Sequence, residues 1–292
     1  LALCALQPNV WMVTAFFIQA PKAQLSVALH STPSGAGYGT GTGFGTPPGP
    51  SRDQSSNMQL ASNMEANIRF AKSMAALPPP VTVQGGALQT WSFPAETERV
   101  LVSMITEGDY GGNPLNANVK LCQGPDNTPQ EMNIYGGKGK LRPVKLVIET
   151  PGDGSSVFIR NQSPLTFPIF ASVGAQMMDD TSAIVSVPAS IYDMSTRQLI
   201  QGNSVRTYEF EPAVSKVKCV LKTDGRPLNA QVELIQGPNA GKITIDVYTE
   251  DGLERPFVTV METPGSGNSV RVINTGTQEF PIIACVEAYE MS

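Results

Sequence analysis

The chain has 292 residues, of which 41% are hydrophobic and only 15% are charged, and its formal net charge is −5. This length suits two ordinary domains, and the acidic balance argues against nucleic acid as the main partner. The four cysteines include no CxxC pair, and the one histidine, His30, lies in a segment that we expect to be removed. A mature chain without histidine lacks the commonest general base and metal ligand, which excludes most hydrolases and metalloenzymes.

The first 52 residues have the composition of a targeting leader. Residues 1–17 are mostly apolar, but Gln7, Pro8 and Asn9 interrupt them, so this stretch is too short to span a bilayer. Residues 1–52 contain no Asp or Glu and many hydroxyl side chains, as organelle transit peptides do. Thr14-Ala15-Phe16 resembles the junction between the signal and transit parts of leaders for plastids of secondary origin. We predict a bipartite plastid-targeting leader over 1–52 that includes a flexible Gly-rich segment, residues 34–50.

A helical arm is predicted over residues 53–80. Between residues 55 and 76 the apolar side chains recur at helical spacing, and three consecutive prolines at 78–80 end the pattern. This stripe is either an ordinary packing face or an adaptable docking face for a partner. Its members are Met58, Ala61, Met64, Ile68, Ala71 and Ala75.

The remainder of the chain is an internal repeat. Residues 114–173 align without a gap with residues 227–286, and 27 of the 60 positions are identical. Residues 84–93 match residues 201–210 at a spacing of 117 instead of 113, which places a four-residue insertion at 109–112. Self-similarity on this scale predicts a tandem duplication. We assign repeat one to 81–176, a linker with a possible extra strand at 183–187 to 177–197, and repeat two to 198–292.

Within each copy the apolar residues alternate with polar ones. Val217, Cys219 and Leu221, for example, alternate with Lys216, Lys218 and Lys222, as in an antiparallel strand with one buried and one wet face. Turn pairs such as Asp224-Gly225 and Asp251-Gly252 punctuate the pattern about every 12 residues, which gives roughly seven or eight strands per copy. The predicted fold is all-β: two tandem, internally duplicated antiparallel β-sandwich domains, jelly-roll or Ig-like, with the N-terminal helical arm.

The two copies share core positions, turn formers and a few polar residues. The shared core is Leu115, Val119, Leu121, Val147, Val157, Ile169, Ala171 and Val173, with Leu228, Val232, Leu234, Val260, Val270, Ile282, Ala284 and Val286. The shared structural motif is Pro114, Leu115, Asn116, Gly124, Pro125, Arg142, Pro143, Glu149, Pro151 and Gly152, with Pro227, Leu228, Asn229, Gly237, Pro238, Arg255, Pro256, Glu262, Pro264 and Gly265. Gln123/Gln236 and Asn161/Asn274 are also shared.

None of these residues forms a recognisable catalytic pattern. Arg142/Arg255 with Glu149/Glu262 could be an acid–base pair, but a salt bridge or a turn brace is the stronger interpretation. Cys122, Cys219 and Cys285 occupy apolar strand positions and are predicted to be small core residues. We therefore predict a chain that is not an enzyme and has no catalytic, cofactor-binding or metal-binding residues.

A duplicated β protein of low charge and without catalytic residues is suited to building a lattice, because open strand edges extend by main-chain hydrogen bonding. Four stretches, KTDGRPLNAQVELIQGPN, EDGLERPF, ETPGSGNSVRVIN and EFPI, with their first-copy counterparts, resemble the diatom pyrenoid shell protein family over about residues 80–290. The resemblance implies a self-assembling sheet around the Rubisco matrix at the periphery of the chloroplast pyrenoid, which would limit CO2 leakage and support carbon fixation. Its partners would be the protein itself and, as further candidates, Rubisco or pyrenoid matrix proteins, with no nucleic acid and no membrane span.

The alternative is a non-catalytic plastid binding module that holds carbohydrate or protein on a strand face. It predicts exposed aromatic residues at matched positions of both copies. The matched candidates are Trp91/Tyr208 and Tyr135/Tyr248, and core filling is the stronger interpretation of the first pair.

Overall fold

The computed structural model describes residues 65, 68–124, 126–152, 154–177, 187–237 and 241–291, all within one compact unit, Pro50–Ser292. The predicted leader over 1–52, residues 53–64 of the predicted arm, residues 183–186 of the predicted extra strand, and the turn residues Pro125 and Pro238 lie outside the described residues. Val187, the last residue of that predicted strand, is described and is not in a strand.

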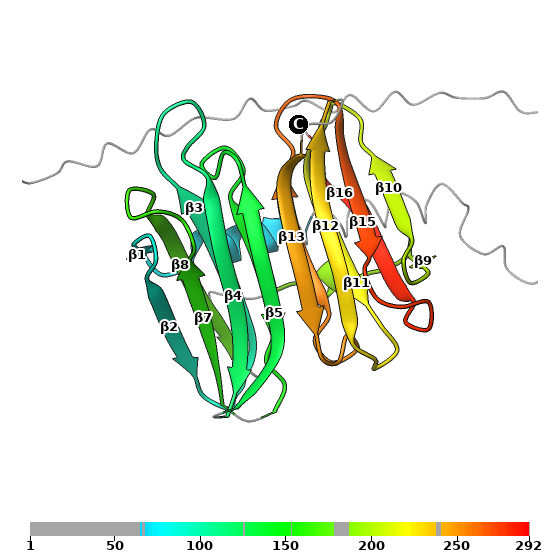
Figure 1. Ribbon diagram of the computed structural model, residues 1–292, viewed down its shortest axis with the longest axis horizontal. Coiled ribbons are helices and arrows are strands. Elements are labelled where there is room, and N and C mark those ends of the chain that lie inside the picture. Colours follow the sequence, from blue (N-terminus) through cyan, green and yellow to red (C-terminus); the bar gives the residue numbers. More distant parts are fainter. Residues whose placement is uncertain are drawn as a thin grey trace, which may run out of the picture. The chain divides into compact units, whose positions relative to one another are not determined.

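The described residues form sixteen strands in two eight-stranded sheets, and every pairing is antiparallel (Figure 1). The predicted all-β architecture is therefore confirmed. Sheet A has the order β1 (Val81–Val83), β8 (Ile169–Met177), β3 (Thr97–Thr106), β6 (Val144–Glu149), β14 (Phe257–Glu262), β11 (Val214–Lys222), β16 (Ile282–Met291) and β9 (Gln198–Ile200). Sheet B has the order β10 (Val205–Glu209), β15 (Asn268–Asn274), β12 (Leu228–Gln236), β13 (Gly241–Thr249), β5 (Asn127–Gly136), β4 (Leu115–Gln123), β7 (Ser155–Asn161) and β2 (Leu88–Phe93).

Both sheets continue from the first half of the chain (β1–β8) into the second half (β9–β16). In sheet A the junction is the pair β6–β14, and in sheet B it is the pair β5–β13. The β6–β14 register is centred on Leu146 opposite Thr259, and the β5–β13 register on Asn133 opposite Asp246. In each pair the two residues are 113 positions apart, so corresponding strands of the two halves meet around one approximate two-fold axis that crosses both sheets.

The main core lies between the two sheets and takes side chains from both halves. All sixteen of the predicted core residues are buried, which confirms that list. Fourteen of them face the space between the sheets. Val147 and Val260 point to the other side of sheet A, where they belong to a second cluster.

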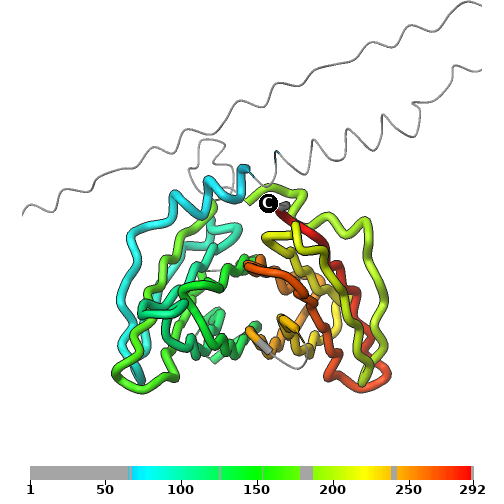
Figure 2. The backbone as a smooth tube through the Cα atoms, turned by 90° about the horizontal axis from the view of Figure 1, so that it is seen from above, coloured from blue at the N-terminus to red at the C-terminus, as the bar shows by residue number. Residues whose placement is uncertain are grey.

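A cover of two short segments creates this second cluster on the outer face of sheet A. Residues 68–75 are helical, and a 3₁₀ helix, η1 (Ala189–Tyr192), follows Pro188. Phe70 and Ile191 pack there against strand side chains such as Val220 and Val258. Figure 2 shows the helix, in blue and cyan, on one side of the two sheets.

Two expectations are wrong because of this cover. The predicted wet face of β11 is covered: Lys218 is only 4% exposed, and Val220 beside it is fully buried. The predicted stripe is not the packing face of the helix either, since Ile68, Ala71 and Ala75 are exposed. The helix instead turns Phe70 and the half-buried Met74 to the sheet.

Candidate assembly surfaces

The shared Arg and Gln residues join the two halves reciprocally. Arg142 Nη2 donates a hydrogen bond to Gln236 Oε1 at 2.6 Å, and Arg255 Nη2 donates to Gln123 Oε1 at 2.7 Å. Each arginine thus binds a side chain of the opposite half. Both arginines are buried, and burial lowers the pKa of the Arg142 guanidinium.

The same glutamines hold the Pro-Gly turns of the shared motif. Gln123 Nε2 donates to the carbonyl of Pro151 at 2.7 Å, and Gln236 Nε2 donates to that of Pro264 at 2.8 Å. The following glycines, Gly152 and Gly265, have φ angles of 95° and 83°, the left-handed region that glycine adopts readily. Each Pro-Gly turn therefore holds a glutamine of its own half, and that glutamine in turn accepts a hydrogen bond from the arginine of the opposite half.

The glutamates of the motif do not pair with these arginines. Glu149 forms a salt bridge with Arg99 on β3 at 2.8 Å, and Glu262 forms one with Lys145 on β6 at 2.5 Å. The expected salt bridges between the motif's arginines and glutamates are therefore wrong, and each glutamate instead joins neighbouring strands of sheet A. The bridge from Glu262 to Lys145 crosses the junction between the halves.

A cavity lies beside each buried arginine. The first, of about 470 Å³, is lined by Lys138, Arg142, Gln236, Lys242 and the turn at Pro264, among others. The second, of about 560 Å³, is lined by Gln123, Pro151, Glu254 and Arg255, among others. We call them the Arg142 pocket and the Arg255 pocket.

The outer strands form open edges among the described residues. β1 and β9 end sheet A, β2 and β10 end sheet B, and each pairs on one side only. Apolar side chains stand on these edges: Leu88 is 47% exposed and Val205 is 55% exposed. β2 carries no charged residue and no proline, so it lacks two common protections against further pairing. β10 also lacks proline but carries the charged residues Arg206 and Glu209.

The shared asparagines fix the short edge strands of sheet A. Asn161 Nδ2 donates to the carbonyl of Val83 at 2.9 Å, and Asn274 Nδ2 donates to that of Ile200 at 3.1 Å. Both asparagines are fully buried. Residues 116 and 229 act through the backbone instead, since the carbonyls of Asn116 and Asn229 accept hydrogen bonds from Gln162 and Thr275.

The aromatic candidates fall into two groups. Trp91 and Tyr208 are partly buried against the main core from β2 and β10, and burial raises the pKa of Tyr208 to about 12. Tyr135 and Tyr248 are 54% and 42% exposed on the outer face of sheet B. A shallow pocket of about 410 Å³ lies beside Tyr248.

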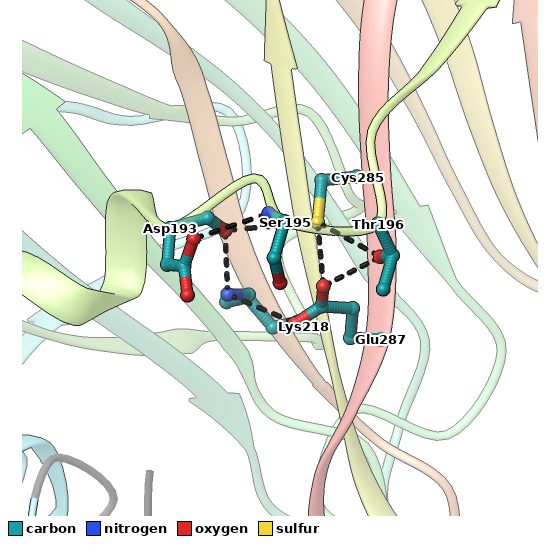
Figure 3. A network of polar contacts seen from close by, with 6 residues as sticks. All are labelled: Asp193, Ser195, Thr196, Lys218, Cys285 and Glu287. Atoms are coloured by element: carbon teal, nitrogen blue, oxygen red, sulfur yellow. Dashed lines mark hydrogen bonds and ion pairs between the residues drawn. The ribbon is translucent and has the colours of Figure 1, made fainter. Parts of the chain in front are cut away.

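A polar network that the sequence analysis missed lies on the outer face of sheet A (Figure 3). The buried Lys218 on β11 lies 3.3 Å from Glu287 Oε2 on β16, and its Nζ donates to the carbonyl of Asp193 at 3.0 Å. Thr196 Oγ1 and Cys285 Sγ both donate to Glu287 Oε1. The network therefore binds the segment after η1 to the sheet.

The chemistry of this network is structural. Burial is the main cause that raises the pKa of Cys285 to about 11, so its thiol is protonated at neutral pH and is a poor nucleophile. Cys219 is fully buried and Cys122 only partly, so the predicted core role suits Cys219 and Cys285 better than Cys122. Comparing the two halves could not reveal the network, because its residues are not shared. The first half has Leu101, Ser172 and Gly174 where the second has Lys218, Cys285 and Glu287.

Within the described ranges, no cluster of three or more His, Cys, Asp or Glu side chains is placed to hold a metal ion. The described helices also include none with the length and apolar character needed to cross a membrane.

Comparison with known proteins gives the family. The model of the family described as diatom pyrenoid shell protein matches residues 72–288, from the 68–75 helix into β16. The chain belongs to this family. As a diatom pyrenoid shell family member it counts among structural shell proteins, and its family implies a pyrenoid inside a plastid. No curated protein matches this family member.

Several solved structures are distantly similar to this pyrenoid shell family member. The PBSX exported protein XepA is 8% identical with a TM-score of 0.23, covering 72% of this chain and 85% of its own. An exo-β-1,3-galactanase from Phanerochaete chrysosporium is 10% identical with a TM-score of 0.22, covering 72% and 57%. The VP2 subviral particle of infectious bursal disease virus is 11% identical with a TM-score of 0.17, covering 73% and 75%. These scores are too low to carry an argument about function.

Proposed function

We propose that the chain is a self-assembling structural protein that forms a sheet-like shell around the Rubisco matrix of the pyrenoid, at its periphery inside the chloroplast. Such a layer would limit CO2 leakage and so support carbon fixation. Family membership supports the shell, and the observation that carries self-assembly is the pair of open strand edges on sheet B, where Leu88 and Val205 are exposed.

Because sheet B has an even number of antiparallel strands, its two edge strands can pair with each other between neighbouring molecules. In an all-antiparallel sheet of eight strands the first and last strands run in opposite directions. A neighbour related by simple translation therefore brings its β10 antiparallel to β2, which is a favourable pairing. Because β2 and β10 belong to one chain but differ in sequence, the contact is head-to-tail and does not close on itself.

The repeat supports the same proposal. We infer that the two halves arose by duplication of a β-sandwich domain, residues 81–176 and 198–292, joined by a linker. The approximate two-fold axis then makes the left and right edges of the molecule similar surfaces. A shell with such a unit needs few distinct contacts.

Electron microscopy of the purified chain tests this function. Residues 53–292 are expected to form sheets or tubes in negative stain. A variant with Leu88→Lys and Thr90→Lys on β2 should lose lateral growth, because the added charges oppose strand pairing at this edge. The matched control is Ile68→Lys, which puts a lysine at a site as exposed as Leu88, 47%, but on the helix over the outer face of sheet A, and should leave assembly unchanged.

Wild-type protein that stays monomeric at every concentration would overturn the proposal. So would sheets that form equally well with both β2 substitutions. A fluorescent fusion of the complete protein in diatom cells is expected to outline the pyrenoid, and a diffuse plastid signal would contradict the peripheral location.

The second candidate is the non-catalytic plastid binding module. Tyr135 and Tyr248 favour it, because they are exposed on one face of sheet B and Tyr248 borders a shallow pocket. If this is the function, monomers should bind a glycan array, and Tyr135→Ala with Tyr248→Ala should abolish binding. The shell function predicts that the same variant still assembles.

A further inference from the structure

Two equivalent loops at the junction of the halves carry opposite charges. The loop between β5 and β6, residues 137–143, reads GKGKLRP, and the loop between β13 and β14, residues 250–256, reads EDGLERP. We call them the basic loop and the acidic loop. The basic loop has three cations and no acid, whereas the acidic loop has three acids and one arginine.

The backbones of the two loops are alike, so the charge difference is not a difference of fold. Arg142 N donates to the carbonyl of Lys138 at 3.0 Å, and Arg255 N donates to that of Asp251 at 3.0 Å. In both loops a β-carbon on the central glycine would lie 2.6 Å from a threonine hydroxyl, that of Thr106 or Thr223. The two loops are therefore similar frames with different side chains.

The Arg142 pocket lacks a counter-charge. Lys138, Arg142 and Lys242 line it, and none of its described lining residues is acidic. Arg142 is 4% exposed, its Nε is buried without a hydrogen-bond partner, and no described carboxylate forms an ion pair with it. A buried cation in this state gains from an approaching anion.

The insertion of the first half braces the basic loop. The amides of Lys140 and Leu141 both donate to the carbonyl of Gly111, at 3.1 and 2.9 Å. Glu107 and Asp109 lie on this side of the molecule, but neither forms an ion pair with a described lysine or arginine. The lysines of the basic loop therefore remain free on a fixed backbone.

The acidic loop carries a surplus of negative charge, three acids against one arginine. Glu254 lies 3.2 Å from Arg255 Nη1 and so compensates the charge of that arginine, where Leu141 stands in the basic loop. Asp251 accepts hydrogen bonds from the amides of Leu253 and Glu254 and thereby shapes the turn. Glu250 is exposed and makes no ion pair with a described residue.

The two loops lie at opposite ends of the same pair of strands. β5 and β13 are antiparallel neighbours, and Figure 1 shows their arrowheads at opposite ends. Gly137 N donates to the carbonyl of Lys242 where β13 begins, and Glu250 N donates to that of Pro129 where β5 begins. The basic and acidic surfaces therefore point in opposite directions along the strands.

We propose that the Arg142 pocket and the basic loop bind the acidic loop of a second copy of this chain, end to end along the strand direction. This contact rests on the proposed self-assembly and adds a second direction to it. The carboxylates of Glu250 and Glu254 approach Lys138, Lys242 and Arg142 of the neighbour. Because the two surfaces differ, the contact is head-to-tail and continues without limit unless a rotation closes it.

Edge pairing and the end-to-end contact together would extend the assembly in two directions, as a layer requires. Edge pairing through β2 and β10 extends the assembly across the strands, and the end-to-end contact extends it along them. Both directions lie in the plane of the sheets. A filament needs only one of these contacts, whereas a two-dimensional wall needs both.

Paired charge reversals test the contact in the full chain. One variant carries Lys138→Glu and Lys242→Glu, and the other carries Glu250→Lys and Glu254→Lys. Each alone should lower the fraction of protein that pellets on sedimentation by at least about tenfold, since like charges now meet at the contact. An equimolar mixture should restore pelleting, because the reversed surfaces complement each other.

Several results would overturn the contact. Single variants that pellet as wild type does, or folded variants that fail to recover when mixed, contradict it while wild-type sheets leave the shell function standing. Wild type that never assembles contradicts both. Circular dichroism checks the folding of each variant. If a charge-reversal variant misfolds, the double variant Lys138→Gln and Lys242→Gln replaces it, and it should reduce pelleting by less than the reversal of the same lysines. If inorganic phosphate at matched ionic strength promotes wild-type assembly, the pocket takes a free anion and not the acidic loop.

Discussion

At the scale of single residues, Lys218 shows how a charge is kept inside this protein. Its ammonium group is buried on the outer face of sheet A, with Glu287 and the carbonyl of Asp193 as partners. Burial alone would raise the pKa of Glu287, but hydrogen bonds from Thr196 and Cys285 and the charge of Lys218 hold that pKa below its usual value. The carboxylate is thus ionised when it faces the lysine.

Replacing Glu287 by glutamine should therefore destabilise the fold. We expect Glu287→Gln to lower the free energy of unfolding by about 2 kcal/mol at neutral pH, because Lys218 then remains buried without a counter-charge. Since the folded-state pKa of Glu287 is depressed, its contribution is present above the unfolded pKa and is lost as the pH falls through the folded pKa. Denaturant unfolding at neutral and at acidic pH measures the difference between the two proteins.

The control for this prediction comes from the first half, which has Leu101 where the second has Lys218. Lys218→Leu in the Glu287→Gln background should recover most of the lost stability, because no charge is left to compensate. A Glu287→Gln variant as stable as wild type at neutral pH would show that the pair does not stabilise the fold.

At the scale of secondary-structure elements, the helix over residues 68–75 covers sheet A. Phe70 is 3% exposed, and its ring meets that of Tyr289 edge to face, with the centroids 5.8 Å apart. The periodic pattern pointed to the opposite face because it counted apolar residues equally. One phenylalanine buries much more apolar area than an alanine does, so the packing follows Phe70.

We predict that Phe70→Ala lowers the free energy of unfolding of the full chain by about 3 kcal/mol, the usual cost of removing a buried aromatic ring. Denaturant titration followed by circular dichroism measures it. The matched control is Ile68→Ala on the same helix, where the side chain is 47% exposed and the expected change is within about 0.5 kcal/mol. Equal effects of the two substitutions would contradict the described packing face.

Strand positions and the main core were predictable, because a period of two identifies a strand and its buried side from local sequence. Leu121 and Leu234, for instance, are fully buried as expected. The partner of each strand was not predictable, because alternation is the same whichever neighbour a strand has. The Arg142–Gln236 bond also escaped prediction, since it joins residues of different halves that nothing in the local pattern connects.

At the scale of the whole described unit, the two halves are joined through both sheets. The isolated second half, residues 198–292, would expose β13 and β14 along the edges that β5 and β6 cover in the full chain. We expect it to dimerise through these edges. Self-pairing around the same axis would place Asp246 opposite Asp246, where the full chain has Asn133 opposite Asp246.

Asp246→Asn should therefore tighten this dimer, because like charges directly opposite each other on paired strands are destabilising. Analytical ultracentrifugation of both versions measures the change. Glu209→Gln, which removes an exposed acid on β10, separated from β13 by β15 and β12, is the matched control and should leave the dimer unchanged. A folded second half that stays monomeric in both versions would contradict the expected dimer.

The one-sided cover of sheet A has a consequence for any wall made by translating this unit. Translation never turns a molecule over, so every copy presents the 68–75 helix toward the same side and the bare strands with Tyr135 and Tyr248 toward the other. Such a wall has a distinct inside and outside from its first two subunits onward. The two surfaces display different side chains, so one can bind partners in the matrix and the other partners in the stroma.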